Sequence, residues 1–127
     1  MTSLADLLSS VVTGLQRSGQ CGAVRVLETQ SFSGQQYAFK VRAELITGDE
    51  LQVRVYRNGD HVDYSYQLLR DALPVMRWDN KEHFPNINSH PHHFHSATGA
   101  VVESPLVGDV DRDLPVVLSL LFPPNSV

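Results

Sequence analysis

The sequence has 127 residues, of which 42% are hydrophobic and 19% charged, a balance typical of one folded domain over residues 1–127 that excludes an intrinsically disordered chain. The formal net charge of −4 excludes a globally basic surface for nucleic acid, so any affinity for RNA must come from local positive charge. No run approaches the roughly 20 apolar residues that cross a bilayer. The single cysteine, Cys21, excludes an internal disulfide framework and a thiolate metal cluster, and we expect a cytoplasmic protein.

An amphipathic pattern predicts a helix over residues 3–17. Thr2 or Ser3 can cap its first turn, and Gly19 follows its last turn. The first residues carry Asp6 and lack the positive segment of a signal peptide, so we expect a helix there. The apolar stripe of this helix consists of Leu4, Leu7, Leu8, Val11, Val12 and Leu15.

Alternation of apolar and polar residues predicts antiparallel strands after this helix. In one of them Phe39 and Val41 alternate with Lys40 and Arg42, which is the pattern of a half-buried strand. Asn58-Gly59 favours a tight type I′ hairpin turn, because both positions need positive φ. Short turns between successive strands indicate a meander whose apolar face must be covered by helices. The expected strands are residues 23–30, 36–46, 50–57, 61–69 and 74–79.

The rest of the chain predicts a long loop, a short strand and a second helix. The loop runs from Asn80 to Thr98 and holds five of the six histidines, and loops of this length in compact domains are often functional. A short strand is expected near residues 100–104. Asp113 can cap the second helix, with Pro115 tolerated in its first turn and Pro123-Pro124 after its end. The helical spacing comes from Leu114, Val117, Leu118 and Leu121.

The predicted fold class is therefore α+β: an N-terminal helix, an antiparallel meander of about five strands, a long His-rich loop and a C-terminal helix packed on one sheet face. The opposite face of the sheet would display Lys40, Arg42 and Arg54. These three residues form a local cationic surface that could hold a nucleic-acid backbone.

The segment His-Pro-His-His-Phe-His, which starts at His90, allows a metal site. In an extended backbone His90 and His92 share one face, and His93 and His95 share the opposite one. A His-x-His pair can chelate zinc or another borderline cation, so one alternative is a metal site built on His90, His92 and His95. The other alternative uses no metal and no cofactor. Further metal ligands could come from His83, Asp79 or Glu82.

The same segment suits acid–base chemistry without a metal, because imidazole exchanges protons near neutral pH. Cleavage of RNA without a metal needs a base for the 2′-hydroxyl, an acid for the leaving 5′-oxygen and positive charge at the phosphorus. His92, His93 and His95 together with Arg77 match these roles in residue type. Arg77 and Asp79 would point to the same side of a strand, where they could also pair only with each other.

Several short motifs between residue 64 and about residue 105 resemble the TumE-type toxins of toxin–antitoxin systems. The chain departs from the family pattern after Asn80, where the family often shows Asn-Ala-Pro-His-His, so that only His83 of that histidine pair remains. The motifs are Tyr64-Ser65-Tyr66, Arg77-Trp78-Asp79-Asn80, His83 with Pro85, and Pro91-His92-His93-Phe94-His95.

The resemblance implies a small toxin that acts on RNA and is neutralised by a cognate antitoxin with a helix-turn-helix DNA-binding part, with a homodimer left open. Our leading hypothesis is a metal-independent endoribonuclease in which His92 and His93 are general base and acid. His95 would complete or orient this pair, Arg77 would stabilise the phosphorane, and Asp79 would orient a histidine.

In this hypothesis Lys40, Arg42 and Arg54 hold the RNA backbone, and Trp78 is either a base-stacking platform or a packed edge residue. Two other hypotheses compete with it. One is a metal-dependent enzyme or metal-binding protein at His90, His92 and His95, and the other is a protein-interaction module without enzymatic activity.

Overall fold

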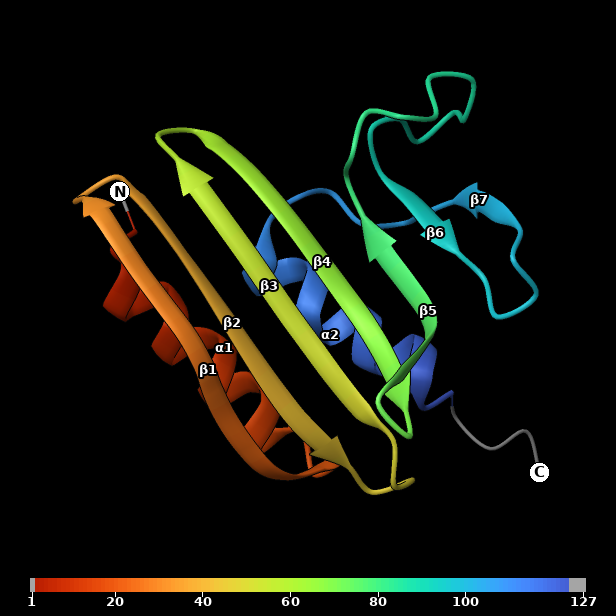
Figure 1. Cartoon of the computed structure of the whole chain (residues 1–127), viewed down its shortest axis with the longest axis horizontal. Coiled ribbons are helices and arrows are strands. Elements are labelled where there is room, and N and C mark those ends of the chain that lie inside the picture. Colours follow the sequence, from red (N-terminus) through yellow and green to blue (C-terminus); the bar gives the residue numbers. More distant parts are fainter. Residues whose placement is uncertain (1, 124–127) are drawn as a thin grey trace.

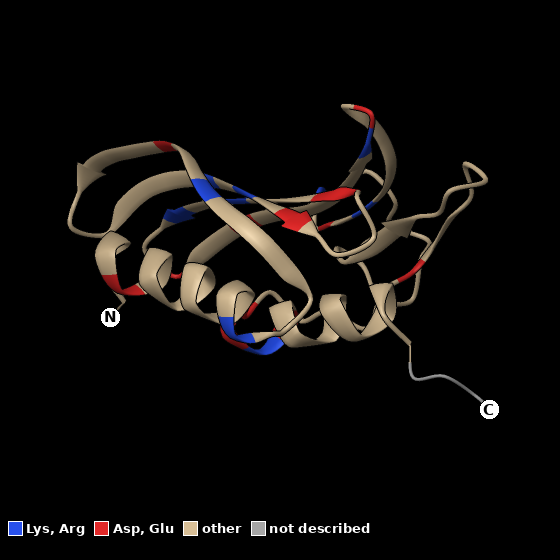
Figure 2. Cartoon of the chain, turned by 90° about the horizontal axis from the view of Figure 1, so that it is seen from below, with Lys and Arg blue, Asp and Glu red and all other residues tan. Residues whose placement is uncertain are grey.

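A computed structural model describes residues 2–123, in which a seven-stranded antiparallel sheet carries two helices on one face (Figures 1 and 2). The strand order follows the chain from β1 to β7, so each strand pairs with the next one in sequence. The elements are α1 (Leu4–Arg17), β1 (Cys21–Ser33), β2 (Gln36–Leu45), β3 (Glu50–Asn58), β4 (His61–Arg70), β5 (Leu73–Asp79), β6 (His93–His95), β7 (Val101–Glu103) and α2 (Val110–Leu121).

The predicted α+β class, the N-terminal helix and the meander are confirmed. Ser3 is the N-cap of α1, and its hydroxyl accepts a hydrogen bond of 3.1 Å from the backbone N–H of Asp6. The short strand predicted near residues 100–104 is β7 (Val101–Glu103), and the sheet is wider than the predicted five-strand meander because β6 joins β7 to β5. The prediction of a loop over residues 80–98 was therefore wrong at His93–His95, which pair as a strand between β5 and β7.

The second helix also begins earlier than predicted. Asp109 is its N-cap, and the side chain accepts from the backbone N–H of Asp111. Asp113, predicted as the cap, lies inside α2 and is buried, and its carboxylate accepts hydrogen bonds from the backbone N–H groups of Val107 and Gly108. The sequence pattern allows a helix start at either Asp109 or Asp113. The preceding loop determines which one is used, because its backbone hydrogen-bonds to the Asp113 side chain. Pro124 and the residues after it lie outside the described residues.

The core lies between the sheet and its two helices. Along β2 and β3, side chains alternate strictly between this core and the open face, as the pleat requires. Both helices lie on the same side of the sheet (Figure 2), and α1 packs against β1, β2 and α2. The fully enclosed residues include Leu15, Tyr37, Val41, Val53, Tyr66 and Val117. No helix among residues 2–123 is long and apolar enough to span a membrane.

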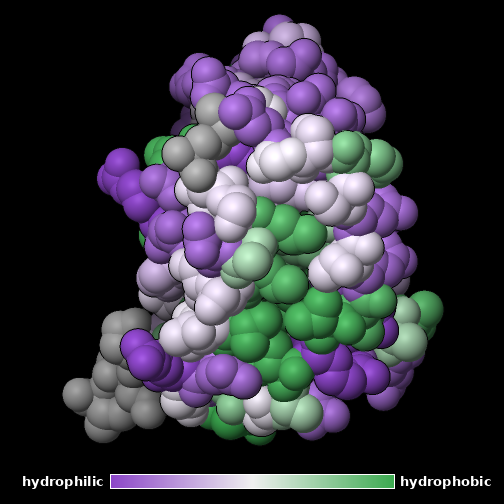
Figure 3. Space-filling model, turned by 90° about the vertical axis from the view of Figure 1, so that its left-hand side faces the viewer, coloured by the Kyte–Doolittle hydropathy of each residue, from purple (hydrophilic) through white to green (hydrophobic). Residues whose placement is uncertain are grey.

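Strand β1 is one edge of the sheet, and it is longer and more exposed than its neighbours. Its large apolar side chains Val26, Leu27 and Phe32 are exposed, and register shifts interrupt its pairing with β2. Figure 3, which views the side of the molecule where β1 and α1 lie, shows an apolar patch on this side. A homodimer stays a prediction, and this edge offers the backbone groups and apolar area that such an association uses.

Replacing Leu15 by alanine should lower the free energy of unfolding by about 2–5 kcal/mol, because it leaves a cavity at the centre of the core. Leu15 has an exposed fraction of 0%, whereas Leu120, on the second helix, has an exposed fraction of 48%. Leu120→Ala should change the free energy by no more than about 0.5 kcal/mol. Urea denaturation of both variants checks this, and equal changes in the two would contradict the described core.

Candidate active site

The open face of the sheet, the one without helices, carries polar side chains in two rows that cross it from edge to edge. Each row is fixed by the antiparallel register, because directly opposed residues point to the same face. The first row is Glu28, Lys40, Arg54, Ser65, Asp79, His93 and Glu103. The second row is Arg25, Arg42, Gln52, Gln67, Arg77, His95 and Val101.

The Arg-Trp-Asp-Asn motif is the end of β5, and the pleat divides its residues between the two faces. Arg77 and Asp79 point to the open face, and Trp78 points to the core, where it is 3% exposed. The Asn80 side chain continues the pairing with β4: its amide donates to the carbonyl of Val62, and its oxygen accepts from the N–H of Tyr64. The motif thus closes the strand and presents two charged groups on one side.

The Pro-His-His-Phe-His segment follows the same rule in β6. His93 and His95 share the open face, whereas the Phe94 ring stacks on Trp78 in the core with ring centres 4.6 Å apart. The pairing of β6 with β5 sets Asp79 opposite His93 and Arg77 opposite His95. Two motifs that are 14 or more residues apart in sequence therefore form one cluster.

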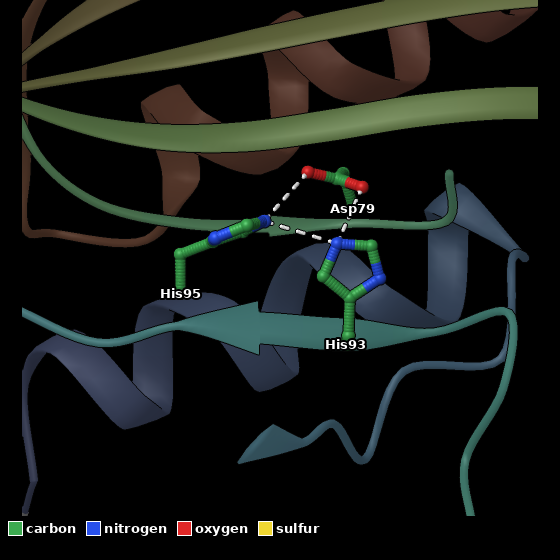
Figure 4. A group of neighbouring side chains, drawn as sticks. All are labelled: Asp79, His93 and His95. Carbon is green, nitrogen blue, oxygen red and sulfur yellow. Dashed lines mark hydrogen bonds and ion pairs between the residues drawn. The ribbon is translucent and has the colours of Figure 1, made fainter. Parts of the chain in front are cut away.

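Asp79, His93 and His95 converge on one point (Figure 4). His93 Nε2 lies 3.0 Å from Asp79 Oδ1, His95 Nε2 lies 3.6 Å from Asp79 Oδ2, and the two Nε2 atoms are 3.0 Å apart. The Arg77 guanidinium donates to Asp79 Oδ2 at 2.7 Å and lies 3.2 Å from His95 Nε2. A carboxylate, two imidazoles and a guanidinium thus share one short network.

The members of this cluster differ in their access to solvent. Asp79 and His93 are 3% and 1% exposed, whereas the side chains of His95 and Arg77 are 27% and 41% exposed. Partial burial lowers the pKa of His95, and the neighbouring Arg77 charge lowers it further, while Asp79 opposes both. His95 is therefore the accessible imidazole, and it is neutral at pH 7.

The cluster forms one wall of a groove of about 590 Å³ on the open face. Phe84, from the loop after β5, covers the histidines, with its ring centre 4.7 Å from that of His93 and 5.8 Å from that of His95. His83 also lines the groove and is exposed. The opposite part of the groove is lined by side chains of β1 to β4, among them Glu28, Gln52, Arg54, Tyr56, Ser65 and Gln67.

Three cations predicted to hold RNA lie on this face, along the central strands (Figure 2). Arg54 lines the groove and forms no hydrogen bond or ion pair with the described residues. Lys40 pairs with Glu28 at 3.2 Å, and Arg42 donates to Gln52 at 2.6 Å. Arg42 Nε is buried without a partner among residues 2–123. Of these three cations, Arg54 is thus the most available to a ligand in the groove.

His92 and Trp78 lie on the core side of the sheet and do not face the groove. Burial raises the pKa of Tyr64, and its hydroxyl oxygen lies within hydrogen-bond distance of His92 Nδ1, at 2.8 Å. Burial lowers the pKa of His92, and Asp113 opposes this. Because His92 and His93 point to opposite faces, they do not act together on one substrate, and the Trp78 ring is covered by Phe94.

The structure does not bring His90, His92 and His95 together. His90 is exposed in the loop before β6, and His92 points away from His95. The sequence signal correctly placed His93 and His95 on one face, and Asp79, predicted to orient a histidine or to add a metal ligand, lies beside both of them. Phe84 was missed, because a single aromatic residue in a loop carries no spacing signal. Ser65 and Gln67 could have been found, since they are the polar positions of an alternating strand.

Comparison with known proteins supports the resemblance of the motifs. The family model described as Toxin TumE matches residues 15–121, which is most of the chain and includes every residue of the cluster. No curated protein and no solved structure shows a significant match. The chain therefore belongs to the TumE toxin family, and it is the toxin component of a toxin–antitoxin system whose partner is a cognate antitoxin.

Proposed function

We propose that this toxin is an endoribonuclease that cleaves RNA by acid–base catalysis at His95, without a metal. The observation that carries the proposal is the meeting of Arg77, Asp79, His93 and His95 at one wall of a groove. A neutral imidazole, a fixed carboxylate and a guanidinium are the groups that transfer of a phosphoryl group to a neighbouring hydroxyl requires.

His95 is the general base in this proposal. It is neutral at pH 7 because its pKa is lowered, its side chain lines the groove, and its Nε2 atom lies next to the Arg77 guanidinium. The 2′-hydroxyl of the RNA gives its proton to Nε2 while its oxygen attacks the neighbouring phosphorus. Buried His93 and Asp79 do not touch the substrate, and they hold His95 in place as positioning residues.

The Arg77 guanidinium stabilises the negative charge that develops on the phosphorane. The leaving 5′-oxygen takes a proton from His83, which is exposed and lines the same groove. The products are a 2′,3′-cyclic phosphate and a 5′-hydroxyl, so one proton is removed and one is returned.

The base and the acid cannot be His93 and His95. In an in-line displacement the attacking and leaving oxygens lie on opposite sides of the phosphorus, and each catalytic atom must come within about 3 Å of its own oxygen. Two catalytic atoms must then be separated by roughly 6 Å or more. The Nε2 atoms of His93 and His95 are only 3.0 Å apart, so they cannot reach the attacking and the leaving oxygen at the same time.

The RNA backbone follows the polar rows across the sheet from the cluster toward β2. Arg54 has no competing partner among residues 2–123, whereas Lys40 and Arg42 must be released from neighbours or shared with them. Local cations of this kind reconcile RNA binding with a net charge of −4. We propose that the protein acts in the cytoplasm, where RNA is accessible. We also propose that its antitoxin carries a helix-turn-helix DNA-binding part.

His95→Ala should reduce RNA cleavage by about 10²- to 10⁴-fold, because general base catalysis contributes a factor of that size. His90→Ala removes an exposed histidine three residues before β6 and should leave cleavage unchanged. Inducible expression, with growth and total-RNA integrity followed together, measures both variants beside the wild type. Thermal unfolding of the purified variants confirms that each is folded.

A His95→Ala protein that stays folded and still degrades RNA would contradict the assignment of the base. If the wild type and the variant are both toxic and neither of them cleaves RNA, the result would instead favour the hypothesis of a protein-interaction module.

Arg54→Ala should weaken binding of single-stranded RNA and reduce the slope of log affinity against log salt by about 0.7, since one phosphate contact is lost. The His95→Ala background prevents cleavage during the titration. Arg70→Ala is the matched control, because Arg70 is an exposed arginine that pairs with Asp49 and does not line the groove. An equal change in slope for both variants would contradict the proposed RNA path.

A further inference from the structure

The Asp79–His93–His95 cluster brings one possible metal-ligand atom from each residue within 4.8 Å of the other two. Donor atoms that surround an ion at about 2.0–2.1 Å are roughly 2.9 Å apart in octahedral geometry and roughly 3.4 Å apart in tetrahedral geometry. The two Nε2 atoms are 3.0 Å apart, which falls in this range, and they face different oxygens of the carboxylate: His93 Nε2 lies 3.0 Å from Oδ1, and His95 Nε2 lies 3.6 Å from Oδ2. Figure 4 shows both imidazoles turned toward the Asp79 carboxylate, so a small rotation of this carboxylate would place one oxygen and the two Nε2 atoms around an ion.

Hydrogen bonds outside the triad fix which ring nitrogens are free to bind. His93 Nδ1 lies 3.1 Å from the carbonyl oxygen of Pro91, which can only accept, so Nδ1 carries the hydrogen and Nε2 presents a lone pair. His95 Nε2 faces a guanidinium N–H of Arg77 at 3.2 Å, which can only donate, so this Nε2 also presents a lone pair. Outer partners of this kind orient the histidines of metal sites.

The Asp79 carboxylate is held in the same way. Its Oδ1 accepts from the backbone N–H of Lys81 at 2.9 Å, and its Oδ2 accepts from Arg77 Nε. Two nitrogen lone pairs and a carboxylate therefore face each other at short range, and such an arrangement needs a positive centre between them. That centre is either a proton or a metal ion.

We infer that Asp79, His93 and His95 form a binding site for a borderline divalent transition-metal ion such as Zn²⁺. Two imidazoles and one carboxylate suit this class, whereas Mg²⁺ and Ca²⁺ require mainly oxygen ligands. The groove gives the ion a path from solvent to the partly exposed His95. This set differs from the His90, His92 and His95 set predicted from the sequence.

The inference rests on the same residues as the proposed ribonuclease site, and it has a consequence for that function. The ion takes the Nε2 lone pair that the base needs, so it inhibits metal-independent cleavage. Arg77 opposes the ion, because its N–H group occupies the His95 lone pair and its charge repels a cation.

Calorimetric titration of the untagged full-length protein with ZnCl₂ tests the site. We expect one ion per chain, and we expect His95→Ala to weaken binding at least about tenfold. His61→Ala is the matched control: His61 also lies beside a carboxylate, with its Nε2 3.1 Å from Asp63 Oδ1, but this pair is exposed and residues 2–123 offer it no third ligand. This variant should bind Zn²⁺ like the wild type.

The Arg77→Ala variant should bind Zn²⁺ several-fold more tightly than the wild type. Misfolding of the variant would not produce such a gain in affinity. Absence of stoichiometric binding, or binding that depends on His61, overturns the inference. Equal or more tightly bound Mg²⁺ also overturns it.

Cleavage of RNA is measured separately, with chelator and with added Zn²⁺. Cleavage that persists in chelator and is inhibited by Zn²⁺ supports both the metal site and the proposed function. If chelator abolishes cleavage while the triad still binds Zn²⁺, the metal site stands and the metal-independent mechanism fails. If RNA cleavage is intact and Zn²⁺ binding is absent, only the metal site fails.

Discussion

The pairing of β5 with β6 is the interaction on which the candidate site depends. It sets Asp79 opposite His93 and Arg77 opposite His95, and the pleat sends all four side chains to the open face. A shift of this register by one residue would exchange them for Trp78 and Phe94, and the site would be replaced by part of the core. The stacked Trp78 and Phe94 rings therefore hold the register from the side opposite to the chemistry.

The same alternation divides the protein into two environments. The helix-covered face is apolar except for groups with assigned partners, such as Asp113 and His92, and for the Tyr66 hydroxyl, which has no partner among residues 2–123. The open face is polar but not fully exposed, since Phe84 and the neighbouring strands shelter the cluster. Partial shelter matters because it lowers the pKa of His95 while leaving the ring within reach of a ligand.

Sequence reasoning predicted what depends on local periodicity. It gave the helix at 3–17, the meander, and the shared face of His93 and His95, because period-2 and helical patterns are visible in single segments. It did not predict the features that depend on contacts between segments far apart in the chain. The strand at His93–His95 exists only because β5 and β7 flank it, and the role of Asp113 depends on the loop that returns over it. The partner of His92, Tyr64, is 28 residues away and could not be inferred from spacing.

Arg77 affects the binding of both a proton and a metal ion to the Asp79–His93–His95 triad. Its guanidinium stands beside the His95 lone pair and shares the Asp79 carboxylate, so it disfavours a metal ion and keeps the imidazole from accepting a proton. A bound phosphate competes for the same guanidinium, because an arginine pairs more strongly with a phosphate than with a neutral imidazole. In the proposed mechanism, substrate would therefore draw Arg77 away from His95 and free the base when RNA is bound. Without RNA the arginine stays in place, and a metal ion must displace it to reach the two histidines.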